Sequence, residues 1–157
     1  MYKIEILVLG KFKEKAYQEL EQVFLKRLQP FAKVVIKELP EVPYSPTFTP
    51  EKALGLEAVT LQKNLSRDAL VVLLDVHGSE RSSKDFAEFL DRVASLGRTV
   101  SFIVGSGYGV SDTIKGMANH IVSFGPLTFP HNLARILLEE QLYRACTIIH
   151  HKAYHKE

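Results

Sequence analysis

The stretch LVVLLDVHGSERSSKDFAEFLDRVASLGRTVSFIVGSGYG, residues 70–109, decides the fold class. Residues 70–74 and 100–104 are short, uninterrupted apolar runs, which are typical of strands buried on both faces of a sheet. Between the two runs, Ser82 and Asp85 have the spacing of a helix capping box, and an amphipathic pattern follows them. A strand, a helix and another strand in this order predict a parallel sheet with helices packed on it.

The same alternation of strands and helices continues on both sides of this stretch. The further predicted elements are a strand at 4–9, a helix at 13–29, an edge strand at 34–39, a helix that begins at Thr49 and Pro50, a short helix from Ser111 to about Asn119, a strand at 121–124 and a helix at 132–149. Four prolines within residues 40–50 predict an extended loop there. We therefore expect one α/β domain over residues 1–157, with a mostly parallel sheet and helices on both of its faces.

The composition narrows the class of protein. The 157 residues are 46% hydrophobic and 24% charged, which is ordinary for a globular domain and excludes a disordered chain. The net charge of +2 is too small to indicate nucleic-acid binding by itself, so any basic surface must come from the arrangement of residues. The single cysteine, Cys146, excludes an internal disulfide, and the N-terminal apolar run is too short for a signal core or a membrane span. We expect a cytoplasmic protein without a membrane segment.

Three predicted loops lie where ligands bind to a parallel sheet, at the carboxyl ends of the strands. They are residues 75–78, 105–109 and 125–131. The middle loop has three alternating glycines but lacks the dinucleotide-binding pattern G-x-G-x-x-G, because position 110 is valine. Glycine lets a backbone approach a ligand closely, but a tight turn without a ligand would use the same residues.

The closing helix, residues 132–149, has apolar residues on more than one side, with charged residues between them. Arg135 and Glu139, and likewise Glu140 and Arg144, are four residues apart, as in solvated ion pairs on a helix surface. A helix with two apolar sides needs two partners. We therefore expect its own sheet on one side and the second subunit of a homodimer on the other.

The tail after this helix contains His150, His151 and His155, together with the aromatic residue Tyr154. No carboxylate or cysteine is grouped with these histidines, so we predict no metal site. Tyr154 and its basic neighbours are suited to stacking on a base and contacting phosphate. A frayed terminus is the simpler interpretation of the same residues.

Four segments together resemble the RlmH-type methyltransferases, a minimal branch of the knotted SPOUT class. They are IEILVLGKFKEK (residues 4–15), LLDVHGSERSS (73–83), TFPHNLARILLEEQLYRA (128–145) and the ending AYHKE (153–157). The resemblance covers essentially the whole chain, and the third segment with the ending is its most specific part. It implies a deep trefoil knot in the C-terminal half, in which residues 125–131 thread a loop. General rules of chain topology would not predict such a knot, because threaded chains are very rare.

The resemblance also implies a cofactor and a reaction. The cofactor is S-adenosylmethionine, and the positions that match the family's cofactor-binding residues are Leu74, Gly105, Phe124, Gly125, Pro126, Leu127, Thr128 and Phe129. The reaction is methylation of N3 of a pseudouridine in 23S ribosomal RNA, on assembled ribosomes. One departure is Ser106, where the family usually has the second glycine of a pair. We expect its added side chain to affect the cofactor pocket by narrowing it.

Methyl transfer to N3 requires a base that takes the N3 proton, and His131, Tyr154 and His155 are the candidates. Arg135 is better suited to bind phosphate or an O4-type acceptor. Because so small a family carries no separate RNA-binding domain, the resemblance implies an RNA site that spans both subunits of a homodimer. The alternatives are a non-catalytic RNA- or ribosome-binding module and a nucleotide-binding regulator that uses the glycine loop. The sequence leaves open which residue is the base, which nucleotide is the target and whether a partner protein is needed.

Overall fold

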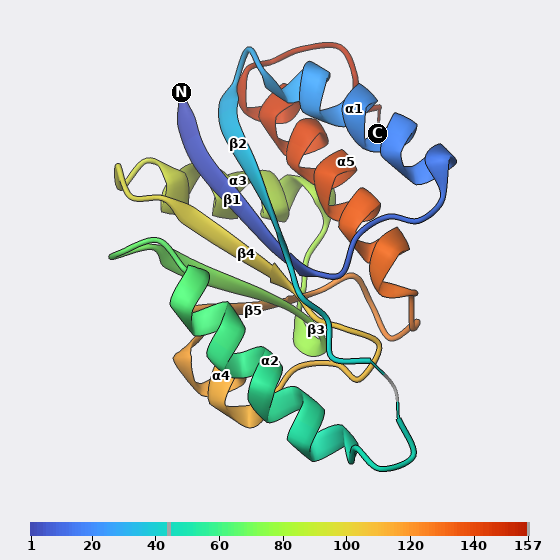
Figure 1. The fold of residues 1–157 in the computed structure, drawn as a ribbon. Helices are drawn as coiled ribbons and strands as arrows, with labels where there is room; N and C mark the ends of the chain where they lie inside the picture. Colours follow the sequence, from blue (N-terminus) through green and yellow to red (C-terminus); the bar gives the residue numbers. More distant parts are fainter. Residues whose placement is uncertain (44, 157) are drawn as a thin grey trace.

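The computed structural model of the chain describes residues 1–43 and 45–156. Strands and helices alternate along these residues (Figure 1), in the order β1 (Tyr2–Leu9), α1 (Lys15–Leu28), β2 (Ala32–Leu39), α2 (Pro50–Asn64), β3 (Leu70–Glu80), α3 (Ser83–Ala94), β4 (Val100–Val104), α4 (Asp112–Met117), β5 (His120–Ser123) and α5 (His131–Ile149). The strands form one sheet in the order β2-β1-β4-β3-β5, and every neighbouring pair is parallel. The predicted α/β class and the edge position of β2 are confirmed.

The helices cover both faces of the sheet. α1, α3 and α5 lie on one face, and α2 and α4 lie together on the other (Figure 1). Each face has its own core: Phe102 of β4 and Phe89 of α3 are buried on the first, and Ile103 of β4 and Leu61 of α2 are buried on the second. Neighbouring residues of β4 thus point to opposite faces, which explains why this strand is an uninterrupted apolar run.

Three helices begin at the caps that the sequence predicts. The Thr49 hydroxyl accepts a hydrogen bond from a backbone N–H in the first turn of α2, and the Ser111 hydroxyl does the same for α4. Ser82 and Asp85 form the reciprocal capping box at the start of α3. Each cap satisfies an N–H group that the first turn of a helix leaves unpaired. The starting points of these helices are therefore set by local sequence.

The prediction of a loop at residues 75–78 is wrong, because β3 continues through them to Glu80. β3 pairs with β5 on both sides of an irregularity in this stretch. Gly78 permits the close approach, since a Cβ at this position would lie 2.7 Å from backbone atoms of Ile121 and Val122. A pairing between segments far apart in the chain thus decides the length of β3.

α5 finds partners for its apolar sides within the chain. It packs against the sheet, and both α1 and α3 contact it (Figure 1). Elements of the same chain therefore cover the apolar sides for which the sequence predicted a second subunit. The homodimer stays a prediction. Of the described helices, none is long and apolar enough to cross a membrane.

Cys146, the one cysteine of the chain, lies in the core between α5 and the sheet. Its side chain is buried, and burial raises the pKa of its thiol to about 12. Because the thiolate is the reactive form of cysteine, an enclosed and protonated thiol is chemically inert.

Candidate functional site

A cavity of about 680 Å³ opens at the carboxyl ends of β4 and β5, beside residues 74–76 of β3. Its lining combines apolar side chains with the backbone of two glycine-containing loops, and it consists of residues 74–76, 104–110, 122, 124, 125, 127–131 and 134. The volume is within the range of small-molecule sites, and ligands bind at this edge in parallel sheets. Of the residues predicted to bind a cofactor, all except Pro126 line the cavity.

Residues 105–109, which we call the first wall, close one side of the cavity. A hydrogen bond from the Gly109 N–H to the Ser106 carbonyl (2.9 Å) holds the turn, and Gly109 has a φ of +86°. A Cβ at position 105 would lie 2.6 Å from the Gly109 carbonyl oxygen and 2.6 Å from Val110 Cγ2. The glycine at position 105 therefore leaves room for the backbone of the wall itself, and not only for a ligand.

The side chain of Ser106 is directed at α2. Its hydroxyl donates to Glu57 Oε2 (2.8 Å) and accepts from the Tyr108 N–H (3.3 Å). Glu57 is 1% exposed, and its Oε1 accepts from the Val42 N–H (3.2 Å). Burial raises the pKa of the Glu57 carboxyl, and the two hydrogen bonds oppose that rise. The Ser106 hydroxyl thus has a fixed partner outside the cavity lining.

Residues 124–130, which we call the second wall, close another side of the cavity. At the base of this wall, the Ser123 hydroxyl donates to the Gly125 carbonyl (3.1 Å) and accepts from the Gly125 N–H (3.0 Å). At its end, α5 begins after Pro130 without a side-chain cap. Between these points Leu127 is 70% exposed, and no side-chain hydrogen bond within the described residues holds positions 126–130.

Asp75 is the one carboxylate among the described residues that line the cavity. Burial opposes its ionisation, but the His77 N–H (2.9 Å from Oδ1) and the Lys115 ammonium (3.5 Å from Oδ2) lower the pKa of this carboxyl. No lysine or arginine belongs to the described lining. The described lining therefore offers no permanently cationic side chain to a phosphate group, and its one carboxylate is already paired with Lys115.

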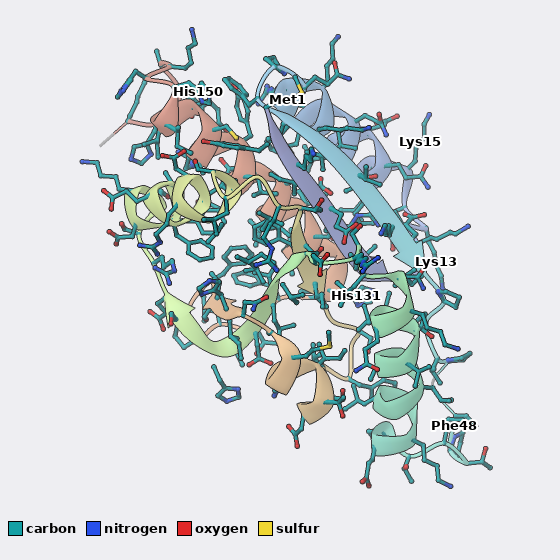
Figure 2. The ribbon with its side chains drawn as sticks, turned by 90° about the vertical axis from the view of Figure 1, so that its left-hand side faces the viewer. Met1, Lys13, Lys15, Phe48, His131 and His150 are labelled. Carbon is teal, nitrogen blue, oxygen red and sulfur yellow. The ribbon has the colours of Figure 1, made fainter. Side chains whose placement is uncertain are left out.

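His131 is the one predicted catalytic residue that the structure brings to the cavity. It is the first residue of α5, so the closing helix carries it to the end of the second wall. Figure 2 shows His131 and His150 at the two ends of this helix, with Lys13, which follows β1, on the same side of the molecule as His131. Of the three predicted ligand loops, residues 105–109 and 125–131 border the cavity as loops, whereas residues 75 and 76 border it from within β3.

Arg135 lies one turn further along α5 and is buried among the carboxyl groups of three glutamates. Its guanidinium donates to Glu21 Oε1 (2.7 Å from Nε) and Glu38 Oε1 (3.0 Å from Nη1), and Glu139 Oε1 lies 3.6 Å from Nε. The Phe12 ring centroid lies 4.0 Å from the guanidinium carbon. The side chains of Arg135 and Glu139 are 3% and 0% exposed, so the prediction of a solvated pair is wrong here. Glu21 of α1 and Glu38 of β2 enclose the pair. The periodicity of α5 alone does not reveal these two residues.

Glu139, one of the three glutamates of this acidic cluster, has a strongly raised pKa. Burial and the neighbouring Glu21 carboxyl raise the pKa of Glu139 to about 9. A proton on Glu139 reduces the crowding of negative charge around the single guanidinium. Arg135 does not line the cavity, and the carboxylates cover its guanidinium. Its predicted role in RNA binding stays a prediction.

Residues 150–156 of the tail fold back along α5, so the interpretation of these residues as a frayed end is wrong. The Tyr154 hydroxyl donates to Glu140 Oε1 (3.0 Å), and His155 Nδ1 lies 3.3 Å from Arg144 Nη1. Arg144 also pairs with Glu140 (2.6 Å), with both side chains partly exposed, as the spacing predicts. Neither Tyr154 nor His155 lines the cavity of its own chain. In the described part of the chain, no three His, Cys, Asp or Glu side chains are grouped to hold a metal ion.

Two buried glutamates that support the site were not predicted. Glu57 stands behind the first wall, and Glu21 holds Arg135. A signal was present, because each acid interrupts the apolar stripe of its helix. Glu57 is three residues after Leu54, and Glu21 is three residues before Phe24. A charged residue at a stripe position indicates a buried polar partner elsewhere in the fold.

The chain is similar to known methyltransferases in sequence. The family model described as "Predicted SPOUT methyltransferase" matches residues 2–155. A protein named ribosomal RNA large subunit methyltransferase H from Desulforamulus reducens is 41% identical, over 99% of this chain and 100% of its own length. The protein of the same name from Caldicellulosiruptor saccharolyticus is 39% identical, over 98% of this chain and 99% of its own length.

Solved structures share the fold. A probable methyltransferase from Bordetella pertussis Tohama I has a TM-score of 0.59 at 13% identity, covering 92% of this chain and 95% of that one. A probable methylase family protein from Haemophilus influenzae Rd KW20 has a TM-score of 0.56 at 14% identity, covering 100% of this chain and 72% of that one. At such identities the likeness concerns the fold alone. The family model and the full-length relatives confirm the resemblance seen in the sequence, and the chain belongs to the SPOUT methyltransferase family.

Proposed function

We propose that this protein uses S-adenosylmethionine to methylate N3 of a pseudouridine in 23S ribosomal RNA, on assembled ribosomes and therefore in the cytoplasm. Relatives that match the chain over its whole length are named ribosomal RNA large subunit methyltransferases. The observation that carries the proposal is that the residues which the resemblance assigns to the cofactor, Pro126 excepted, surround one cavity. Sequence similarity and geometry thus support the same activity.

The cavity suits S-adenosylmethionine in its size and its chemistry. Leu74, Phe124 and Phe129 offer apolar contacts to an adenine ring, and the backbone of both walls offers hydrogen bonds. The cofactor carries positive charge on its sulfonium and ammonium groups, which matches a lining that contains Asp75 and no lysine or arginine. The same lining disfavours a nucleotide-binding regulator, because phosphates would need positive partners.

When bound, S-adenosylmethionine supplies a methyl group that its sulfonium charge already activates. The protein then has two tasks, to hold N3 of the pseudouridine in line with that methyl group and to take the N3 proton. His131 is the candidate base that lines the cavity within the same chain. In this role the His131 imidazole would accept the proton that N3 has to lose.

Tyr154 and His155 take part in this reaction only if a second subunit presents them. The Tyr154 hydroxyl is hydrogen-bonded to Glu140. Glu140 is nine residues after His131 in α5, so the two residues are about 13 Å apart along the helix axis. We therefore propose a homodimer in which the tail of one subunit approaches the cavity of the other. Tyr154 then stacks on the RNA, and the basic residues beside it contact phosphate. Arg135 joins the RNA site only if its contacts with carboxylates open.

Two measurements on the full chain test the proposal. Titration calorimetry should show saturable binding of S-adenosylmethionine, and ribosomes that lack the modification should receive a methyl group from it. Ribosome binding without methyl transfer would favour the alternative of a non-catalytic ribosome-binding module. A folded protein that binds no S-adenosylmethionine would contradict the proposed cofactor.

The proposed homodimer has its own test. Light scattering during size exclusion should give twice the 17.7 kDa mass of the chain. A monomer at the concentrations used for activity would remove Tyr154 and His155 from the reaction, because neither reaches the cavity of its own chain.

A further inference from the structure

A buried carboxylate lies directly behind the first wall. Glu57 shares the buried side of α2 with Ala53, Ala58 and Leu61, and it is 1% exposed. An acidic group in such a place is tolerated only when hydrogen bonds replace the water that it has lost. The side-chain hydrogen bonds that Glu57 makes both come from segments outside α2.

Two distant segments meet at this carboxylate. Oε2 accepts from the Ser106 hydroxyl of the first wall (2.8 Å), and Oε1 accepts from the Val42 N–H of the proline-rich loop (3.2 Å). The Ser106 hydroxyl accepts in turn from the Tyr108 N–H (3.3 Å), in the middle of the turn. A chain of hydrogen bonds therefore runs from the backbone of the first wall, through Ser106, to α2.

We infer that Glu57 is a positioning residue for the cofactor pocket, which acts through the Ser106 hydroxyl to hold the first wall in its binding shape. The inference rests on the proposed function, because it requires that S-adenosylmethionine contacts this wall. Hydrogen bonds to a carboxylate are stronger than those between neutral groups, and this one is shielded from water. The wall is therefore preformed, and a ligand does not have to order it.

Whether cofactor binding tightens or weakens when the Ser106 hydroxyl is removed distinguishes two roles for this residue. If the serine side chain merely narrowed the pocket, its removal would tighten cofactor binding. If the serine positions the wall, its removal leaves the Glu57 carboxylate buried without its hydroxyl donor and weakens cofactor binding. In that case, serine in place of the family's usual glycine adds a hydroxyl, and Glu57 accepts a hydrogen bond from this hydroxyl.

Dissociation constants for S-adenosylmethionine, measured well below the unfolding temperatures, test the inference. We expect Ser106→Ala and Glu57→Ala to weaken binding by about tenfold each, and the double variant to be no weaker than either, because the two residues act as one unit. Glu57→Gln should stay within about twofold of the wild type, since an amide can still bond to both partners. Ser95→Ala is the matched control and should change nothing, because it removes a serine hydroxyl that donates to Asp91 outside the cavity.

Amide hydrogen exchange without cofactor gives a readout that does not depend on the proposed function. In Ser106→Ala, the amides of Tyr108 and Gly109 should exchange faster, while the amides of β4 keep their protection. If the wild type bound no cofactor and the amides still behaved in this way, the proposed function would fail and the positioning of the wall would stand. If Glu57→Ala does not fold, Ser106→Ala alone decides. Unchanged or tighter cofactor binding by folded Ser106→Ala, or unchanged exchange of these amides, would overturn the inference.

Discussion

The two walls of the cavity are built in different ways. The first wall, residues 105–109, is tied through Ser106 to a buried glutamate on another helix, and it has no room for a side chain at position 105. The second wall, residues 124–130, is bonded at its base and then leaves Leu127 70% exposed. We therefore expect the first wall to keep its shape when a ligand binds and the second wall to adjust around the ligand.

From this difference we expect the first wall to select the ligand and the second wall to let the products leave. A preformed wall binds without a large loss of conformational entropy, so it can discriminate between ligands. A wall that closes after binding excludes water from the reacting groups and opens again to let the products leave. Within the described residues, only the first wall is tied to a buried acid, Glu57, whereas the hydrogen bonds at the base of the second wall come from Ser123.

Gly105→Ala should break the first wall, and it has the largest expected effect. The new Cβ would lie 2.6 Å from the Gly109 carbonyl oxygen, so the turn would have to open. We expect cofactor affinity to fall by about a hundredfold, which corresponds to ~3 kcal/mol. Gly116→Ala is the matched control, because a Cβ there meets nothing within 4 Å and the residue lies outside the cavity lining. Titration calorimetry on both variants makes the comparison, and equal affinities would contradict a wall of fixed shape.

A second prediction concerns stability and not affinity, and it is a pH effect on α5, the helix that follows the second wall. Folding raises the pKa of Glu139 from its ordinary 4.5 to about 9, so between these values the folded state holds a proton that the unfolded chain releases. Binding of this proton stabilises the folded state. The stabilisation is fully present below pH 4.5 and is lost as the pH rises toward 9, at up to about 1.4 kcal/mol per pH unit. Glu139→Gln carries no such proton, so it should gain stability relative to the wild type as the pH rises.

Chemical unfolding at a series of pH values measures this slope. Glu88→Gln, at an exposed position of α3, is the control and should follow the wild type at every pH. If Glu139→Gln also ran parallel to the wild type, Glu139 would have to be ionised in the folded protein.

Leu127→Ala tests whether the second wall closes. Because this side chain is 70% exposed, its replacement should change the free energy of unfolding little. If the wall folds over S-adenosylmethionine, the variant loses apolar contact and should bind about fivefold more weakly, or ~1 kcal/mol. Leu96→Ala, at a 61% exposed position outside the cavity lining, is the control. Cofactor affinity equal to that of the control would mean that the second wall stays open.

The smallest expected effect is the change in the first wall when cofactor binds. Amide exchange at residues 107–109 should slow only slightly, because hydrogen bonds through Ser106 already hold the turn. Exchange at residues 127–129 should slow clearly, because the second wall becomes ordered by the ligand. Equal protection of both walls would remove the difference between them.

Local sequence patterns predicted what depends on local interactions. The apolar runs marked the buried strands, and Thr49, Ser82 and Ser111 marked the starts of three helices. A cap or an apolar run acts within a few residues, so its meaning can be read before the fold is known. The positions around the cavity came from the family resemblance, since glycine and apolar residues alone are compatible with a simple turn.

Contacts between distant segments account for what the sequence did not predict. Residues 75–78 look like a loop, and pairing with β5 makes them part of β3. Glu57 looks like an ordinary charge on a helix until Ser106 is placed against it, and Arg135 looks solvated until Glu21 and Glu38 enclose it. Each buried charge depends on a partner at least one element away, and periodicity within a helix does not show that partner.

The state of Cys146 makes this chain well suited to carry a single reporter group. It is the chain's one thiol, and it stays enclosed and protonated, with its pKa raised to about 12 by burial. A thiol-directed label therefore has no native site to react with at neutral pH. In a Leu127→Cys variant, the new cysteine would take the whole label, and its fluorescence or spin signal would follow the opening and closing of the second wall without any change to the native core.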